Sequence, residues 1–177
     1  MKKVLLFALL LFIVPSCQNK SPERFKTASA EIDLLKKGLT DYENANWEEW
    51  FKQYADSAKI FQNTWSQFES PEGVMKRHQE LITKLLSYSF DKENLFFEQV
   101  IDDKGRTWVN FWGLWTGKLK ANEKIIEIPV HLNFQFINGK IVKEYGYWDT
   151  IQLYEELKKA EFVSSHKVAE EDSKMAP

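Results

Sequence analysis

The stretch KIIEIPVHLNFQFINGKIVKEYGYWD, residues 124–149, decides the fold class of this chain. Apolar and polar residues alternate along most of it, which is the period of β-strands with one covered face. Asn138-Gly139 divides the stretch and is typical of a tight turn in which both residues have positive φ. We therefore predict a long antiparallel hairpin formed by residues 124–137 and 140–148.

Alternation assigns the side chains of this hairpin to two faces. In its first strand every second residue from Ile126 to Phe136 is apolar, and His131 points away from them with Asn133 and Gln135. A β-bulge would reverse the position of His131. In the second strand, strict alternation places Ile141, Tyr145, Tyr147 and Asp149 together on one side. We expect these odd-numbered residues to face the interior of the domain.

The preceding segments extend the hairpin into a meander of strands. Residues 95–101 and 106–118 have the same period, and the turn signal Asp102-Asp103-Lys104-Gly105 separates them. Along 106–118, Val109, Phe111 and Trp115 face one way, and Trp108, Trp112 and Leu114 face the other. A strand that is apolar on both sides is buried on both sides. Helices can cover one face, and the other needs a ligand or a second subunit.

Helical periodicity dominates the residues before these strands. The predicted helices are residues 28–42, 47–54, 70–85 and 151–160, with a brief strand at 59–62. Ser70-Pro71 is a typical helix start, a capping residue followed by proline at the first helical position. Helices first and antiparallel strands afterwards predict an α+β domain in which the helices cover one face of an antiparallel sheet.

The N-terminus has the layout of an export signal. Lys2 and Lys3 precede the uncharged apolar run 4–14, and Cys17 follows as the only cysteine. The run is too short to cross a bilayer, which needs about 20 residues, and it suits the apolar region of a secretory signal. Val14-Pro15-Ser16-Cys17 resembles the lipobox of bacterial lipoproteins. The alternatives are a secreted protein with a spare thiol and a buried structural cysteine.

The lipobox resemblance implies both location and organisation. It implies a signal peptide at 1–16, a lipidated Cys17 with a tether at 17–26, a folded domain at 27–162 and a disordered tail at 163–177. Several acyl chains on Cys17 would hold the protein stably in a lipid bilayer. We expect a lipid-anchored protein of the bacterial cell envelope. Gln18, in place of the aspartate that retains some lipoproteins in the inner membrane, favours the outer membrane.

Composition and missing motifs exclude several classes of function. The formal charge is −2, so no basic face for nucleic acid is expected. A single cysteine provides no disulfide framework, and the core must come from 7 Trp, 6 Tyr and 13 Phe. We find no His-Glu-x-x-His, no phosphate loop and no Gly-x-Ser-x-Gly motif, and we predict neither a metal nor a cofactor.

The end of the quoted stretch resembles a known family. GKIVKEYGYWD, residues 139–149, is similar to the closing strand of the SnoaL-like branch of the nuclear-transport-factor-2-like superfamily, including Glu144, Tyr145 and Asp149. Tyr54-Ala55-Asp56-Ser57-Ala58 resembles the segment after the family's second helix, and the order of elements agrees from about Thr27 to Ala160. The resemblance implies a half-open cone, a cystatin-like roll whose curved sheet surrounds an apolar pocket.

This resemblance leaves three functional hypotheses open, because the family includes polyketide cyclases, ketosteroid isomerase relatives, epoxide hydrolases, dehydratase relatives and proteins with no chemistry. The first is a lipid-anchored module that binds a small apolar or aromatic ligand, or a partner, in the cone. The second is a cofactor-independent acid–base enzyme of isomerase, cyclase or dehydratase type. The third is a structural element that forms a homodimer through the outer sheet face. Fold alone does not choose among them.

Asp149 and Tyr147 are the predicted catalytic residues. The resemblance makes Asp149 an acid–base group, and desolvation beside Tyr145 and Tyr147 would raise its pKa toward a useful range. The alternative is structural, because Asp149 and Gln152 have the spacing of a helix capping box. A tyrosine hydroxyl could stabilise an oxyanion in the pocket.

The predicted ligand pocket contains aromatic and histidine side chains from several elements. Its residues are Tyr54, His78, Trp112, Trp115, Tyr145 and His131. His78 lies on the apolar side of the third predicted helix, and the tryptophans would give a flat wall for a ring-shaped ligand. Core packing is the alternative for each of them.

Overall fold

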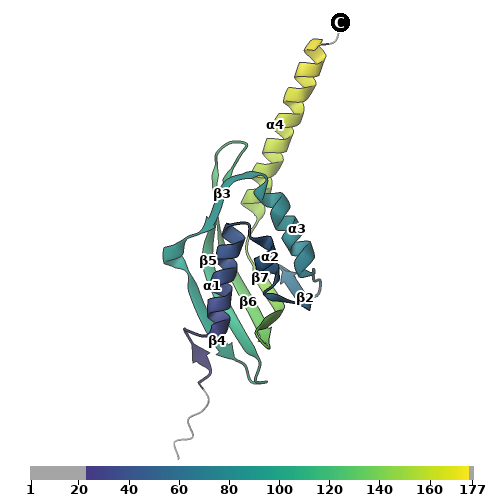
Figure 1. Ribbon diagram of the computed structural model, residues 1–177. Helices are drawn as coiled ribbons and strands as arrows, with labels where there is room; N and C mark the ends of the chain where they lie inside the picture. The colour runs from purple at the N-terminus through teal and green to yellow at the C-terminus, as the bar shows by residue number, and fades with distance from the viewer. Residues whose placement is uncertain (1–22, 176–177) are drawn as a thin grey trace, which may run out of the picture.

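One curved sheet of seven strands wraps around a layer of helices (Figure 1). This computed structural model describes residues 23–175, with side chains described for residues 23–163. The helices are α1 (Ala30–Glu43), α2 (Trp47–Phe51), α3 (Pro71–Ile82) and α4 (Ile151–Met175), with a 3₁₀ turn η1 (Lys92–Asn94). The strands are β1 (Phe25–Lys26), β2 (Tyr54–Gln62), β3 (Leu85–Phe90), β4 (Phe96–Ile101), β5 (Thr107–Leu119), β6 (Ile125–Ile137) and β7 (Lys140–Tyr147). The α+β fold predicted from the sequence is confirmed.

The predicted hairpin forms the centre of the sheet. β6 pairs with β5 along its whole length and with β7 on its other side, both antiparallel. Asn138 and Gly139 connect β6 to β7 with φ values of 52° and 71°, as the turn signal predicted. β4 and β3 share the far edge of β5, with β4 on residues 107–112 and β3 on residues 115–119. The long strands β5 and β6 therefore carry the curvature of the whole sheet.

Two strands differ from the prediction. The third predicted helix extended to Leu85, whereas α3 ends at Ile82 and Leu85 begins β3, which the sequence analysis missed. β2 is longer than the predicted segment 59–62, and it pairs in parallel with β7, so the sheet is antiparallel except at this edge. Both differences depend on pairing with distant strands, which local periodicity does not report.

The C-terminal helix is longer than predicted. The sequence predicted a helix ending at Ala160 and a disordered tail at 163–177, whereas α4 continues to Met175. No glycine or proline interrupts residues 151–175, so the chain has no strong stop signal there. Leu153 is buried and Leu157 packs against the core, which fixes the first turns of α4 on the domain.

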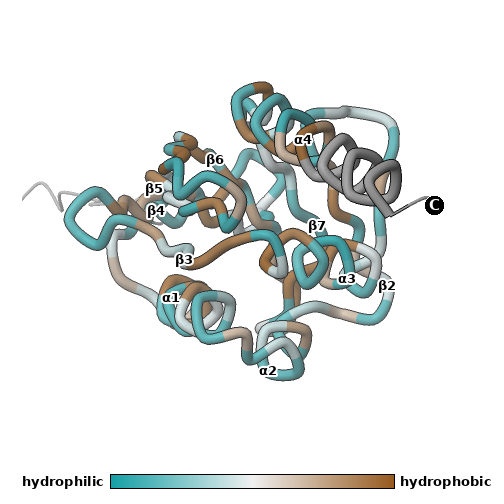
Figure 2. The backbone as a smooth tube through the Cα atoms, turned by 90° about the horizontal axis from the view of Figure 1, so that it is seen from above, coloured by the Kyte–Doolittle hydropathy of each residue, from teal (hydrophilic) through white to brown (hydrophobic). Residues whose placement is uncertain are grey.

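The inner side of the sheet and the helices share one hydrophobic core. Figure 2 looks down on the cone and shows the strands arcing around the interior, with α1 and α2 beside it. Ile32 of α1, Val109 of β5 and Ile126 of β6 are fully buried in this core. Ser29 and Ser70 cap α1 and α3, because their hydroxyls accept hydrogen bonds from the N–H groups of Ile32 and Gly73, both at 3.2 Å. The helices are thereby fixed against the concave face.

Candidate functional site

A partly open cavity of about 450 Å³ lies between the sheet and the helices. Its walls are mostly apolar. They include Leu35, Leu39 and Val74 from α1 and α3, Phe111 and Trp115 from β5, Ile128, Val130, Leu132 and Phe134 from β6, and Leu153 and Leu157 from α4. The inner face of β6 is the one that alternation predicted from Ile126 to Phe136. Volume and lining are those of a small-molecule site.

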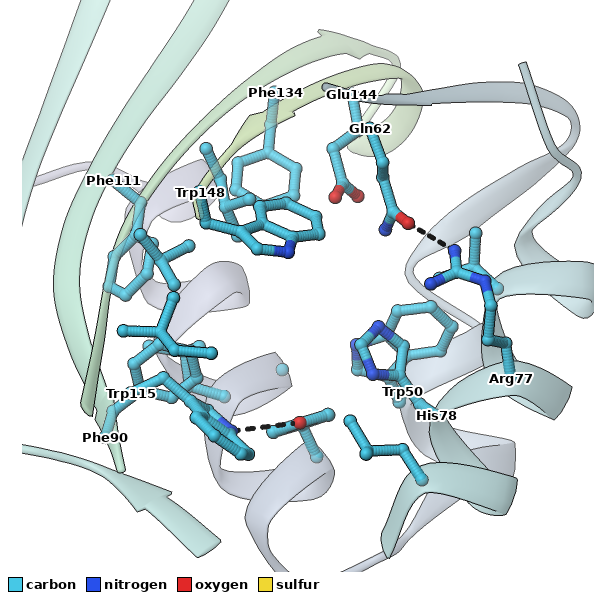
Figure 3. A pocket seen from close by; sticks show the side chains of 18 of the residues that line it. Trp50, Gln62, Arg77, His78, Phe90, Phe111, Trp115, Phe134, Glu144 and Trp148 are labelled. Carbon is cyan, nitrogen blue, oxygen red and sulfur yellow. Dashed lines mark hydrogen bonds between the residues drawn. The ribbon is translucent and has the colours of Figure 1, made fainter. Parts of the chain in front are cut away.

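A buried carboxyl, Glu144 of β7, points into this cavity (Figure 3). Its Oε2 accepts a hydrogen bond of 2.6 Å from the hydroxyl of Tyr54, which is also buried. Burial raises the pKa of Glu144 to about 7, although the Tyr54 hydrogen bond and the positive charge of Arg77 act in the opposite direction. Burial, followed by the charge of Glu144, raises the pKa of Tyr54 well above its usual value. The pair therefore places a group that titrates near neutral pH in an apolar wall.

A β-bulge in β7 orients the side chain of Glu144 toward the cavity. Phe136 of β6 pairs with Ile141, but the preceding residue Gln135 pairs with Lys143, so Val142 is an extra residue in β7. The bulge reverses the alternation from that point. Ile141 and Glu144 both line the cavity as a result. Glu144 belongs to the family motif in residues 139–149, but strict alternation placed only Ile141, Tyr145, Tyr147 and Asp149 toward the interior.

The same bulge overturns the predicted placement of Tyr145, Tyr147 and Asp149. None of the three lines the cavity. Tyr145 stacks on Phe61 at 4.8 Å on the outer face of the sheet, and Tyr147 is exposed. Asp149 lies in the exposed turn before α4, where its Oδ1 accepts a hydrogen bond of 2.8 Å from the N–H of Ile151. This hydrogen bond ties Asp149 to the first residue of α4 and differs from the predicted capping box, which pairs Asp149 with Gln152. The expected position of Asp149 beside a ligand was wrong.

Two further predicted pocket residues, Trp112 and His131, also lie outside the cavity. They pair across β5 and β6, and their rings stack 4.7 Å apart with an angle of 5° between the planes. Alternation had already put both of them opposite the apolar face of β6. The central strands have no bulge at this point to bring them inward. Both side chains therefore belong to the outer surface of the sheet.

Three predicted pocket residues do line the cavity: Tyr54, His78 and Trp115. The indole N–H of Trp115 donates a hydrogen bond of 3.2 Å to the hydroxyl of Tyr42, and the ring of His78 contacts Tyr42 edge-on at 5.4 Å. Burial lowers the pKa of His78 to about 4, so its imidazole is neutral at pH 7. Its Nδ1 is buried and makes no hydrogen bond with any residue that the structure describes.

Several polar and aromatic lining residues were not found from the sequence. Arg77 donates hydrogen bonds to Gln62 and, at 3.2 Å, to Glu69, and Figure 3 shows Gln62 beside Glu144. Trp50 and Trp148 add flat aromatic surface. The side-chain nitrogen of Gln53 is buried without a hydrogen-bond partner among the described residues. Only the tertiary fold brings these residues together, because they come from α2, α3, β2 and the end of β7.

The described part of the chain holds no group of three or more His, Cys, Asp or Glu side chains placed to bind a metal ion. The searched helices also include none that is long and apolar enough to cross a membrane. Cys17, the predicted lipidation site, lies outside the residues that the structure describes, as do the predicted signal peptide and most of the tether.

Comparison with known proteins identifies the fold. No family model matches the sequence, and no curated protein matches it. A candidate polyketide cyclase of Xanthomonas campestris pv. campestris is similar in structure, with a TM-score of 0.57 and 11% identity over 76% of this chain and 99% of that one. A SnoaL-like candidate polyketide cyclase of Shewanella putrefaciens CN-32 gives a TM-score of 0.54 and 15% identity over 75% and 98% of the two chains.

A nuclear-transport-factor-2-like protein of Burkholderia xenovorans LB400 is similar to the same extent. Its TM-score is 0.55, with 14% identity over 73% of this chain and 98% of that chain. At such low identity the likeness concerns the fold and leaves the reaction open. Residues 23–163 therefore have the nuclear-transport-factor-2-like fold, an architecture shared by ligand-binding and enzyme-type proteins.

Proposed function

We propose that this domain binds a small, mostly apolar molecule inside its cone and that its role requires no reaction. A cavity of about 450 Å³ lies within the range of about 300–1,000 Å³ that is usual for small-molecule sites. The observation that carries the proposal is Glu144, a buried carboxyl on an apolar cavity wall with Tyr54 as its hydrogen-bond donor. Burial of a carboxyl is unfavourable unless its oxygens form hydrogen bonds. The carboxyl of Glu144 is therefore suited to contact a polar group of the ligand.

The lining defines the chemistry of this ligand. Its body is apolar or aromatic, because Trp50, Trp115 and Trp148 offer flat surfaces. It carries a small number of polar groups. Glu144 accepts a hydrogen bond from the ligand when it is ionised and can donate one when it is protonated. The side-chain nitrogen of Gln53 and Nδ1 of His78 have no hydrogen-bond partner among the described residues, so both are free to contact a polar group of the ligand.

Binding is tested with N-phenyl-1-naphthylamine, an uncharged aromatic probe whose fluorescence rises when it leaves water. Saturable binding at one site is expected. Leu132→Trp fills the cavity from the inner face of β6 and should abolish the signal, and Val130→Phe should weaken it. Leu114→Trp on the outer face of β5 is the matched control and should bind as the wild type does. Equal binding by Leu132→Trp and Leu114→Trp would overturn the proposal.

We also propose that the domain is anchored to the bacterial cell envelope, with the outer membrane favoured, through acylated Cys17. The support is the apolar run 4–14 followed by Val14-Pro15-Ser16-Cys17. The full chain should incorporate an alkyne-tagged palmitate in a bacterial host and fractionate with membranes. Cys17→Ser should lose the tag, and Cys17→Ser chains that still incorporate it would contradict the anchor.

A second candidate function is acid–base catalysis with Glu144 in the role that was predicted for Asp149. The favouring observation is the pKa of Glu144, about 7, which suits a general base at neutral pH. In the simplest isomerisation the carboxylate takes a proton from a carbon beside a ligand carbonyl, leaves an enolate, and returns the proton to another carbon. Glu144→Gln would stop solvent deuterium entering the bound molecule without abolishing its binding. A ligand that exchanges no deuterium with the wild type supports the binding function alone.

A further inference from the structure

The carboxyl of Glu144 lacks a positive partner in the cavity. Its Oε2 accepts the hydrogen bond of Tyr54, but no residue in the described range donates to Oε1 or forms an ion pair with Glu144. Arg77, the other charged residue among those that line the cavity, is paired with Glu69 at 3.2 Å. When Glu144 is ionised, it is therefore an uncompensated negative charge, which is unfavourable in an apolar interior.

Two tryptophans of the cavity wall lie beside this carboxyl. Trp50 packs on the ring of Tyr54 with the ring centroids 4.8 Å apart, so it is one side chain away from Glu144. The indole of Trp148 covers Gly146, which follows Glu144 on the inner face of β7, and a Cβ at Gly146 would lie 2.2 Å from Cζ3 of Trp148. Figure 3 shows Trp50, Trp148 and Glu144 around the open centre of the cavity. The faces of tryptophan rings attract cations, so both rings add to the attraction of the carboxylate.

We propose that the ligand of the cone is an amine that is protonated at neutral pH and carries an apolar or aromatic body. Its ammonium group donates a hydrogen bond to Oε1 of Glu144 and contacts the rings of Trp50 and Trp148. The ammonium supplies the positive charge that the cavity lacks, and a charge-assisted hydrogen bond is stronger than a neutral one. The body of the ligand lies against the apolar wall that includes Phe111 and Trp115. This inference rests on the proposed function, because it names the class of molecule that the cavity binds.

The other groups that face Glu144 favour a cation over a neutral or an anionic ligand. The hydroxyl of Tyr54 donates its only hydrogen to the carboxyl, so it is not free to bind a ligand carbonyl. Arg77 already donates hydrogen bonds to Gln62 and Glu69. His78 is neutral at pH 7, because burial lowers its pKa to about 4. No group of the cavity therefore leaves a positive charge free for an anion, and an anion would bring a second negative charge beside the carboxylate.

The test compares three ligands that share a naphthyl body and differ in their polar end. Isothermal titration calorimetry of the full chain at pH 8 measures the binding of 2-(1-naphthyl)ethylamine, of the neutral 2-(1-naphthyl)ethanol and of the anionic 1-naphthylacetate. The amine should bind at least about tenfold more tightly than the alcohol, and the acetate should bind least.

Variants assign this preference to the carboxyl and to the rings. In Glu144→Gln the amine and the alcohol should have similar dissociation constants, whereas Glu127→Gln, at an exposed position of the same sheet, should keep the preference of the wild type. Trp148→Leu should weaken the binding of the amine more than that of the alcohol. Trp112→Leu, on the outer face of β5, is the matched control and should leave both unchanged.

Proton release tests the same contact in the wild type, without any variant. At pH 6 the carboxyl of Glu144 mostly holds its proton in the free chain, because burial raises its pKa to about 7. The amine binds the ionised form, so its binding should release close to one proton, which calorimetry in buffers of different ionisation enthalpy measures. The alcohol carries no charge and should release none.

Three results would overturn the inference: an amine that binds no more tightly than the alcohol, an acetate that binds more tightly than the amine, or amine binding at pH 6 without proton release. The proposed function fails by a different result, the absence of cavity binding by the uncharged N-phenyl-1-naphthylamine. If that probe binds as expected and the amine shows no preference, the cavity binds ligands but not by their positive charge.

Discussion

Glu144 brings a titratable group into the apolar interior of the cone. A carboxyl in such surroundings prefers its neutral form, because burial penalises the charge more than Tyr54 and Arg77 favour it. Its ionisation is therefore linked to the stability of the domain and to the ligand that it faces. A ligand that donates a hydrogen bond or carries a positive charge binds best to ionised Glu144, and one that only accepts hydrogen bonds binds best to the protonated form.

The first prediction concerns stability and pH. In the folded chain the pKa of Glu144 is raised from 4.5 to about 7. Between these values the unfolded chain has lost its proton while the folded chain still holds it, so the free energy of unfolding falls as the pH rises. The loss is on the order of 3 kcal/mol and is complete above the folded pKa. Urea unfolding of the wild type at a series of pH values from 4 to 8 measures it.

Glu144→Gln removes this contribution, because the amide does not titrate and still accepts the hydrogen bond of Tyr54. The variant should gain stability relative to the wild type between pH 5 and pH 8. Glu127→Gln, at an exposed position of the same sheet, serves as the matched control and should follow the wild type. If the curves of the wild type and of Glu144→Gln ran parallel, Glu144 would not titrate in the interior as described.

The second prediction concerns Tyr54, whose hydrogen bond favours ionised Glu144. Tyr54→Phe removes the hydroxyl, so the pKa of Glu144 should rise further above 7. The fall in stability should then extend to higher pH than in the wild type. The carbonyl stretch of protonated Glu144, followed by infrared difference spectroscopy against pH, measures this directly. An unchanged or lower midpoint in Tyr54→Phe would contradict the pairing.

At the scale of single elements, β7 shows where sequence reasoning succeeds and where it stops. Its bounds, its turn at Asn138-Gly139 and its pairing with β6 follow from residue types. Its two faces do not, because the extra residue Val142 reverses the alternation and nothing in the local pattern marks a bulge there. One inserted residue therefore moved the site from Asp149 and Tyr145 to Glu144.

The other missed elements have a related cause. β3 alternates only over the short run from Leu86 to Phe90, and its first residue, Leu85, continues the apolar stripe of α3, so a helix ending at Leu85 satisfied the pattern. The parallel pairing of β2 with β7 brings together residues about ninety positions apart, such as Tyr54 and Glu144, whose side chains are hydrogen-bonded. Contacts at this separation are set by the closing of the cone, which single-segment propensity does not encode.

The third prediction concerns α4, which closes one wall of the cavity with Leu153 and Leu157. Leu153 is 7% exposed, whereas Ile151 in the same turn of the helix is 64% exposed. Leu153→Ala should lower the free energy of unfolding by about 2 kcal/mol, because it enlarges a cavity. Ile151→Ala should change it by less than about 0.5 kcal/mol. Equal effects in chemical denaturation would show that α4 does not pack on the domain as described.

At the scale of the whole molecule, the sequence predicted the architecture better than the site. Long strands after helices and a turn signal were enough for an α+β domain, and the family resemblance of residues 139–149 implied the cone. The inner face of β6 was also placed correctly, because its alternation from Ile126 to Phe136 is uninterrupted. The polar groups of the cavity were missed, since Gln62, Arg77 and Glu144 meet only after three elements close around the interior.

The sheet also explains how one domain presents two separate aromatic surfaces. Strand β5 is apolar on both sides, with Phe111 and Trp115 toward the cavity and Trp108 and Trp112 toward the outer face. The sequence indicated that both apolar faces of this strand must be covered by other groups. We assign a ligand to the inner side.

The seven tryptophans of the chain allow the central claim to be tested directly. Their indole N–H signals, assigned by Trp→Phe variants, are followed by ¹H–¹⁵N NMR while N-phenyl-1-naphthylamine is added. The signals of Trp50, Trp115 and Trp148, which line the cavity, should shift, and those of Trp65 and Trp112 on the outer face should stay in place. Shifts confined to Trp65 and Trp112, or no shifts at all, would contradict a ligand site inside the cone.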